Sequence, residues 1–198
     1  MREFVLKLGR RNRGTGIRAA DVRYTGAMSP RRKVVVAVGL PGAGKSTYFA
    51  RRGIVPLSSD LIRELLYDDA ADQRHPEWVF AALRELLRRR LAGGAQDTYI
   101  DATNLTRYFR RSFIAIAREF GCAAEALYFD VPLEVCLERN RKREKQSAGP
   151  GRHARVVAEE AIRRMARRIE PPTREEGFSR IVVIRPRGQK SRSRAKAE

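Results

Sequence analysis

Residues 34–48, VVVAVGLPGAGKSTY, constrain the fold of this chain more than any other stretch. The first five are β-branched or small apolar residues, a composition typical of a strand that is buried on both faces of a parallel sheet. This strand leads directly into residues 39–46, which match the pattern G-x-x-x-x-G-K-[ST], and a helix is favoured immediately afterwards. The stretch therefore predicts the first strand, turn and helix of an open α/β sheet.

The chemistry of this turn points to a phosphate group. Gly39, Gly42 and Gly44 allow the backbone to turn tightly and to aim successive N–H groups at an anion. The helix that follows favours negative charge at its N-terminus. Lys45 is placed to reach the β- and γ-phosphates, and the Ser46 hydroxyl is placed to bind Mg²⁺. The alternative is a chance glycine-rich turn, but the full pattern arises by chance in well under about 1% of chains of this length.

We therefore predict a phosphate-binding loop for a nucleoside triphosphate, ATP or GTP, with Mg²⁺. Its predicted nucleotide-binding residues are Gly39, Leu40, Pro41, Gly42, Ala43, Gly44, Lys45, Ser46 and Thr47.

Length and composition indicate one α/β domain with extensions. The chain has 198 residues, enough for a core without disulfides, and its two cysteines, Cys122 and Cys136, lie in apolar patterns that predict buried, reduced thiols. No stretch approaches the roughly 18–20 apolar residues of a membrane span, and the N-terminus lacks the apolar stretch of a signal peptide. We therefore expect a cytoplasmic protein with no membrane partner.

Most of the net charge of +19 comes from the two ends of the chain. Residues 1–33 hold ten Lys/Arg against two acidic residues, and residues 185–198 hold six against one. Residues 34–184 are much closer to neutrality, with 26 basic and 20 acidic residues. We therefore divide the chain into a basic N-terminal extension (1–32), a central domain (33–184) and a basic, disordered tail (185–198). Such ends either are simply solvated or hold nucleic acid through phosphate contacts.

The central domain alternates strands and helices. Strands are predicted over 33–38, 54–57, 98–101, 125–131 and 181–184. Helices are predicted over 44–52, 76–91, 106–120 and 155–169, with two more beginning near residues 59 and 132. This order, without internal repeats, predicts a five-stranded parallel sheet with helices on both faces.

Two acidic residues follow strand ends, where ligands of open α/β sheets bind. Asp60 and Arg63, three residues apart, would share the first turn of a helix and could face a hydroxyl group and a neighbouring phosphate. Asp101 ends the next strand, where it could help to hold Mg²⁺ or orient a substrate. The alternative interpretation of both carboxylates is that they cap the helices that follow.

A cluster of basic residues precedes a glycine- and proline-containing loop. Arg139 and Arg143 are four residues apart on one helix face, and Arg141 is turned away from them. Residues 139–155 have the composition of a mobile lid, and arginines that enter from a lid neutralise charge during phosphoryl transfer. The simpler alternative is that these cations only stabilise the helix C-terminus.

Four motifs, GLPGAGKSTY, SSDLIREL, IDATNLT and FDVPLEVCLERNRKR, occur together in this order over residues 33–184. In this combination the chain resembles the P-loop kinase domain of bacteriophage-type polynucleotide 5′-hydroxyl kinases. The resemblance implies a P-loop kinase fold with an arginine-bearing lid, and often a homo-oligomer. No D-x-D phosphatase signature follows, so the implied protein lacks the 3′-end repair domain that often accompanies such kinases.

The resemblance also implies roles for individual residues. Asp60 would be the general base for the acceptor 5′-hydroxyl, and Arg63 would bind an acceptor phosphate. Asp101 and Asn104 of the D-x-T-N-L motif would support the acceptor site. Arg143 would engage the donor phosphates, together with Arg139.

The leading hypothesis is thus ATP-dependent transfer of the γ-phosphoryl group to a hydroxyl, most specifically the 5′-OH of RNA or DNA during nucleic acid repair. The first alternative is a small-molecule kinase or an aminoacyl-tRNA kinase of the same fold. The second is a nucleotide-gated nucleic-acid-binding protein without acceptor chemistry.

Overall fold

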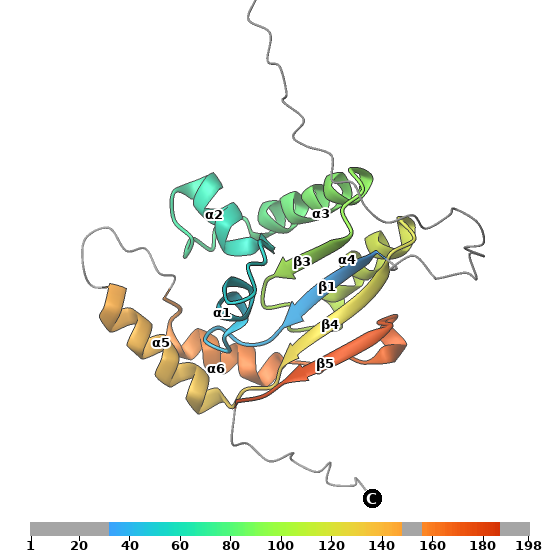
Figure 1. Ribbon diagram of the computed structural model, residues 1–198. Coiled ribbons are helices and arrows are strands. Elements are labelled where there is room, and N and C mark those ends of the chain that lie inside the picture. The colour runs from blue at the N-terminus through green and yellow to red at the C-terminus, as the bar shows by residue number, and fades with distance from the viewer. Residues whose placement is uncertain (1–31, 148–155, 187–198) are drawn as a thin grey trace, which may run out of the picture. The chain divides into compact units, whose positions relative to one another are not determined.

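The computed structural model describes residues 32–147 and 156–186 (Figure 1). The predicted N-terminal extension lies almost wholly outside these ranges, as do most of the predicted tail and residues 148–155 of the predicted lid. The division into extension, domain and tail therefore stays a prediction.

Within the described residues, five parallel strands form one sheet in the order β2-β3-β1-β4-β5. The strands are β1 (Lys33–Val38), β2 (Leu57–Ser58), β3 (Asp97–Asp101), β4 (Ala123–Phe129) and β5 (Arg180–Ile184). β1 lies in the middle, and its last five residues are buried as the run of valines predicts. The predicted α/β fold with a five-stranded parallel sheet is confirmed, and with its glycine turn after β1 it is a P-loop kinase-like fold.

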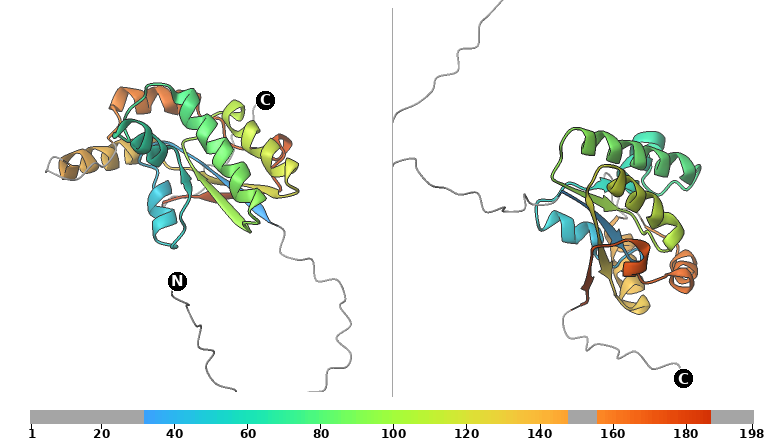
Figure 2. Two further views of the ribbon diagram at one scale, coloured as in Figure 1. Left: turned by 90° about the horizontal axis from the view of Figure 1, so that it is seen from above. Right: turned by 90° about the vertical axis from the view of Figure 1, so that its right-hand side faces the viewer.

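Helices cover both faces of the sheet (Figure 2). They are α1 (Lys45–Ala50), α2 (Ser59–Tyr67), α3 (Pro76–Ala92), α4 (Arg107–Glu119), α5 (Leu133–Ser147) and α6 (Glu159–Arg168), followed by the short 3₁₀ helix η1 (Arg174–Glu176). None of the helices in these ranges is long and apolar enough to cross a membrane.

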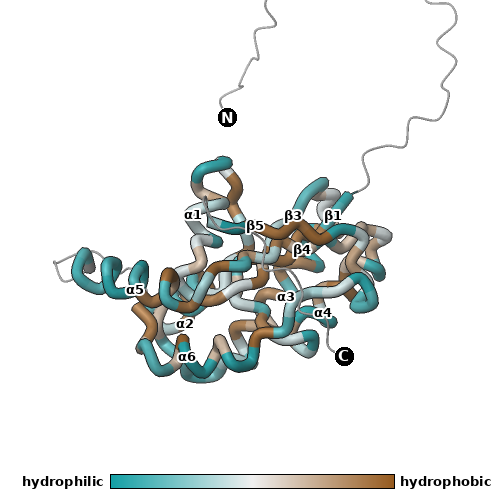
Figure 3. The backbone as a smooth tube through the Cα atoms, turned by 90° about the horizontal axis from the view of Figure 1, so that it is seen from below, coloured by the Kyte–Doolittle hydropathy of each residue, from teal (hydrophilic) through white to brown (hydrophobic). Residues whose placement is uncertain are grey.

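The alternation of side chains along β1 divides the core into two clusters. Val34, Val36 and Val38 pack with α2, α3 and α4, whereas Val35 and Ala37 pack with α1, α5 and α6. Each fully buried valine contributes about 1.5–3 kcal/mol relative to an exposed one, so both faces of β1 stabilise the sheet. The tube in Figure 3 is brown mainly along the strands and teal along much of α5, so the apolar residues are concentrated in the sheet.

Two strands differ from the predicted boundaries by more than one residue. β2 was expected at 54–57 but pairs only through Leu57 and Ser58, because Pro56 has no N–H for a ladder. β4 was expected at 125–131 but begins at Ala123, directly after the left-handed Gly121 ends the preceding helix. At its other end, the Asp130 N–H turns to the carbonyls of Tyr128 and Ile184, so the strand stops at Phe129.

The two cysteines are free and buried, as predicted. Cys122 accepts a hydrogen bond from the Arg32 guanidinium at 3.4 Å, and Cys136 lies beside the phosphate-binding loop. Burial raises the pKa of the Cys136 thiol, while the nearby positive charges of Lys45 and Arg139 act in the opposite direction. The thiol is therefore protonated at neutral pH.

Candidate active site

The glycines of the predicted phosphate-binding loop adopt conformations that other residues rarely take. Gly42 and Gly44 have φ of 80° and 96°, in the left-handed region. A Cβ on Gly42 would lie 2.4 Å from the Cys136 carbonyl oxygen, so this close approach of loop and α5 requires glycine. The loop therefore passes tightly between β1 and α5, and it ends where α1 begins at Lys45.

Lys45 folds back over the loop. Its ammonium group donates hydrogen bonds to the carbonyls of Gly39 and Leu40, both at 2.9 Å, and the residue is only 8% exposed. A buried ammonium group is stable only where polar or negatively charged groups surround it. The hydrogen bonds to Gly39 and Leu40 therefore hold the predicted phosphate-binding cation against the start of the loop, just after the end of the central strand.

Ser46 and Asp101 lie together. The Ser46 hydroxyl donates to the Asp101 carboxylate, with 2.7 Å between Oγ and Oδ2, and joins the start of α1 to the end of β3. Asp101 does not occupy the N-cap position of either helix: that of α1 is Gly44, and that of α4 is Thr106. A hydroxyl and a carboxylate side by side are the kind of hard oxygen pair that Mg²⁺ takes from a protein while keeping phosphate and water ligands.

Asp60 lies in the first turn of α2. The helix cap is Ser58, whose hydroxyl accepts the N–H groups of Asp60 and Leu61, so the carboxylate of Asp60 is not used as a cap. It pairs instead with the Arg63 guanidinium at 3.2 Å. The Asp60 side chain is 36% exposed, whereas that of Arg63 is 6% exposed.

The register of the sheet brings Asp60 and Asp101 to the same edge. Ser58, the last residue of β2, is the partner of Asp101, the last residue of β3. Asp60 is two residues beyond Ser58, so both predicted carboxylates lie at the carboxyl ends of adjacent strands. In an open α/β sheet this edge is where ligands bind.

Asn104 faces inward rather than into a cleft. Its side-chain amide donates to the Ala37 carbonyl at 2.8 Å, and the residue is 1% exposed with a left-handed φ of 47°. The neighbouring Thr103 carbonyl accepts the N–H of Gly39 at 3.1 Å. In this geometry Asn104 holds the loop after β3 against β1 and the phosphate-binding loop, which differs from the substrate contact expected from the sequence.

Arg139 of α5 contacts the phosphate-binding loop directly. Its Nη1 donates to the carbonyls of Gly42 and Ala43 at 3.3 and 3.4 Å. Arg143 follows one turn later and is half-buried. Arg141 points elsewhere and pairs with Glu159 of α6, in agreement with the predicted helix faces.

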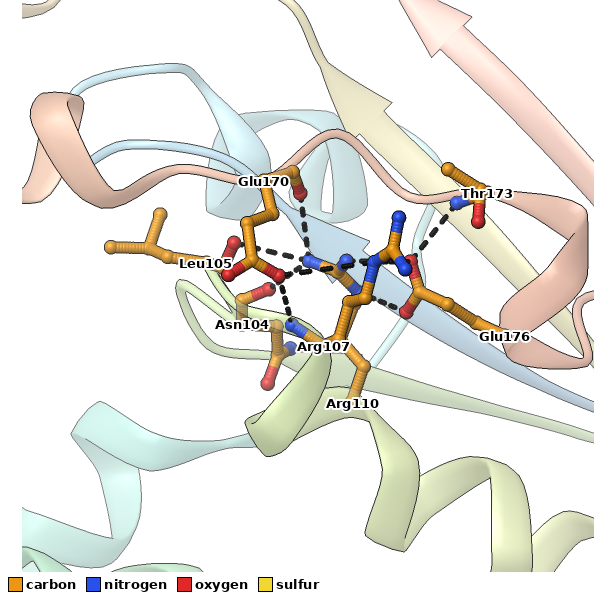
Figure 4. A network of polar contacts seen from close by, with 7 residues as sticks. All are labelled: Asn104, Leu105, Arg107, Arg110, Glu170, Thr173 and Glu176. Atoms are coloured by element: carbon orange, nitrogen blue, oxygen red, sulfur yellow. Dashed lines mark hydrogen bonds and ion pairs between the residues drawn. The ribbon is translucent and has the colours of Figure 1, made fainter.

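Arg110 was not recognised from the sequence, yet it organises the wall behind the site (Figure 4). It is 0% exposed and forms two 2.7 Å hydrogen bonds with the Glu176 carboxylate. Its Nη1 also donates to the carbonyls of Asn104, Leu105 and Glu170. This single side chain therefore joins the loop after β3 to the chain that follows α6.

Asn140 is a second residue that the sequence did not single out. Its side-chain amide donates to the Val157 carbonyl at 2.7 Å and accepts the Val157 N–H at 3.2 Å. The residue is 1% exposed. Two reciprocal bonds of this kind copy the pairing of adjacent strands and fasten the chain before α6 to the middle of α5.

A cleft of about 990 Å³ opens beside Arg63 at this edge of the sheet. Its walls come from the start of α2, from α3, α4 and α6, and from the loop after β3. This cleft was not predicted from the sequence, because its walls come from segments more than 100 residues apart.

A family model described as an AAA domain (AAA_33) matches residues 34–172. Transcription factor bHLH140 of Arabidopsis thaliana is 31% identical over 156 residues, which are 75% of this chain but only 15% of that protein. The chain thus spans a small part of the length of this curated relative.

Two solved structures share the fold. A candidate kinase from Chloroflexus aurantiacus is 14% identical, with a TM-score of 0.58 over 78% of this chain and 88% of that chain. Chaetomium thermophilum Kti12, crystallised in complex with ADP-AlF3, is 19% identical, with a TM-score of 0.57 over 77% and 88% of the two chains. At these identities the similarity concerns the fold.

Proposed function

The chain belongs to the AAA domain family, and from this premise we propose that it is an ATP-dependent phosphotransferase that moves the γ-phosphoryl group to a hydroxyl acceptor. The observation that carries the proposal is the arrangement at the carboxyl edge of the sheet. The phosphate-binding loop with Lys45 follows the central strand, and the Asp60–Arg63 pair follows a strand two positions away beside the cleft. A protein that only bound nucleotide would have no use for that pair.

The donor side is built from the loop and α5. The loop amides and Lys45 would hold the β- and γ-phosphates of ATP, and Arg139, with Arg143 one turn further, would neutralise charge on the group in transfer. Ser46 and Asp101 would hold Mg²⁺, which when bound would neutralise charge on the phosphates. Two protein oxygens are enough for an ion that also takes phosphate and water ligands.

The acceptor side is built from the start of α2. Asp60 would accept the proton of the acceptor hydroxyl while the oxygen of that hydroxyl forms a bond to the γ-phosphorus. The bond between that phosphorus and the β,γ-bridging oxygen would break, and ADP would leave. Arg63, held in a buried position by the Ser59 carbonyl and by Asp60, would grip a phosphate of the acceptor. Positioning and charge supply most of the acceleration in such a reaction.

The acceptor that this geometry and the motif resemblance favour is the 5′-OH of a polynucleotide, RNA or DNA. A buried guanidinium three residues from the proposed base suits an acceptor that carries a phosphate next to its hydroxyl. A role in nucleic acid repair in the cytoplasm, and assembly as a homo-oligomer, belong to the same proposal.

The test is incubation of the protein with γ-labelled ATP and Mg²⁺ and a panel of acceptors: 5′-OH RNA, 5′-OH DNA, tRNA, sugars and amino alcohols. Asp60→Ala should lower transfer by a factor on the order of 10² to 10⁴ while ATP still binds. Glu64→Ala is the matched control, because Glu64 is an exposed carboxylate on the same helix. Transfer by Asp60→Ala at the wild-type rate, or no labelled acceptor in the whole panel, would contradict the proposal.

A further inference from the structure

The cleft beside Arg63 has a shelf of aromatic rings on the side formed by α3 and α4. The rings of Phe80 and Phe109 stack with centroids 5.5 Å apart, and Tyr108 meets Phe109 edge to face at 5.6 Å. Tyr108 is 65% exposed and Phe109 is 39% exposed. Exposed rings next to one another at a cleft are available to stack on a planar ligand.

The same cleft is strongly basic. Six arginines from α2, α3, α4 and α6 line it: Arg63, Arg84, Arg111, Arg164, Arg167 and Arg168. Among the described residues that line the cleft, Glu77 is the one acid. Arg167 pairs with Glu160, whereas Arg84, Arg111, Arg164 and Arg168 have no carboxylate partner in the part of the chain that the structure describes. Four such guanidinium groups around one cleft favour a ligand with several negative charges.

We propose that this cleft binds a single-stranded nucleic acid, with bases stacked on Phe109 and Tyr108 and phosphates on the surrounding arginines. Stacking is possible for any base but requires that the base is unpaired, and arginines can follow the backbone without reading its sequence. The 5′ end of the strand would lie at Arg63, beside Asp60. The inference rests on the proposed function for the statement that the 5′ end lies at Arg63. It adds a binding track, formed by Tyr108, Phe109 and the cleft arginines, for the nucleotides that follow that end.

The number and placement of the arginines favour a strand over a small acceptor. Arg84 is on α3, Arg111 on α4 and Arg164 on α6, so cationic side chains from three helices line the cleft. The cleft volume of about 990 Å³ is at the upper end of pockets for small molecules. Arg111 also lies over the Tyr108 ring, with 4.4 Å from its guanidinium carbon to the ring centroid, which puts a charge and a stacking surface within one short segment.

The experiment measures binding of a fluorescent 5′-OH single-stranded oligonucleotide to the full chain without ATP, across a salt series. Tyr108→Ala should weaken binding about tenfold, within the range for loss of one stacked base, and Tyr108→Phe should restore it. Arg84→Glu with Arg111→Glu should weaken binding further and lower the salt slope by about 1.4. The control, Arg90→Glu with Arg180→Glu, makes the same charge change at exposed positions outside the cleft and should have a much smaller effect.

Two results would overturn the inference. One is wild-type binding by both Tyr108→Ala and the cleft charge variant, and the other is equal weakening by the cleft and control charge variants, because the net charge alone would then explain the affinity. Transfer assays separate this inference from the proposed function. Transfer to a mononucleoside 3′-phosphate with no binding of the oligonucleotide would refute the track and leave the kinase. Cleft-dependent binding without transfer to any acceptor would refute the kinase and leave the track.

Discussion

Replacement of Arg110 by methionine tests how much the buried Arg110–Glu176 pair contributes to the stability of the fold. Methionine keeps much of the apolar stem of the side chain but removes the guanidinium group. Glu176, whose side chain is 6% exposed, then keeps a negative charge and loses its two 2.7 Å bonds to Arg110. The backbone N–H of Thr173 remains as a donor to it at 3.0 Å, and the exposed Arg107 guanidinium remains an ion-pair partner at 4.0 Å.

The expected loss in the free energy of unfolding is about 3–5 kcal/mol, the usual cost of removing one partner of a buried ion pair. The three carbonyls that Arg110 Nη1 serves, of Asn104, Leu105 and Glu170, also lose a donor. Because domains of this size have a total stability of about 5–15 kcal/mol, the variant should remain folded but marginal.

Glu176→Gln added to Arg110→Met should recover part of that loss, since the buried carboxylate charge, which then has only the more distant Arg107 as a cationic partner, is removed. Urea unfolding of the wild type, the two single variants and the double variant gives the cycle. Arg88→Met is the control: it breaks the exposed Arg88–Glu119 pair at 3.2 Å and should cost about 1 kcal/mol or less. If Arg110→Met were no more costly than Arg88→Met, the stabilising role that we assign to the buried network would be refuted.

Three further predictions concern the loop, its neighbouring thiol and the chain ends. Gly42→Ala should abolish ATP binding and lower the melting temperature, since its Cβ would meet the Cys136 carbonyl at 2.4 Å. The control is Gly53→Ala, which is also at positive φ but has open space around it and should lower the melting temperature only slightly. ATP binding by Gly42→Ala would contradict the geometry. Burial raises the pKa of the Cys136 thiol above the unfolded value of about 8.5, so above that pH the unfolded chain releases a proton that the folded state keeps. The contribution of the buried thiol to the free energy of unfolding is therefore complete below about pH 8.5 and is lost as the pH rises further. Melting temperatures from pH 7 to 9.5 should therefore fall more steeply in the wild type than in Cys136→Ala. Equal slopes in the two proteins would contradict this prediction. Removal of residues 1–30 and 186–198 should raise the KM for a polynucleotide acceptor and make that KM less dependent on salt. Transfer kinetics of the truncated chain at two salt concentrations test this, and an unchanged KM with an unchanged salt dependence would refute it.

The sheet and the phosphate-binding loop were predictable because their signals are local. A run of valines defines β1, and the spacing of three glycines before Lys45 defines the loop, whatever the rest of the chain does. Asp101 was predicted at a strand end for the same reason, with two roles left open. The Ser46 contact at 2.7 Å favours the Mg²⁺ role, and it required the structure because the two residues are 55 positions apart.

The parts that were missed depend on contacts between distant segments. Arg110 lies in the sequence RYFRRSF and looks like one of several exposed arginines of an amphipathic helix. Nothing near it shows that Glu176, 66 residues later, will meet it in the core. Asn140 in RNRKR looks equally like part of a basic surface. The cleft was missed for a related reason, since periodicity predicts which face of a helix is buried but not where two helices leave a gap.

The pair of bonds between Asn140 and Val157 has a consequence for how this protein can vary. Because Val157 is bound to a fixed point on α5, the two ends of the segment that joins them are held in place whatever its length. Lengthening such a loop costs little, about 0.6 kcal/mol per doubling. Insertions between residues 147 and 156 should therefore leave the position of Arg139 against the phosphate-binding loop unchanged, so that the length of this segment can vary without rebuilding the donor site.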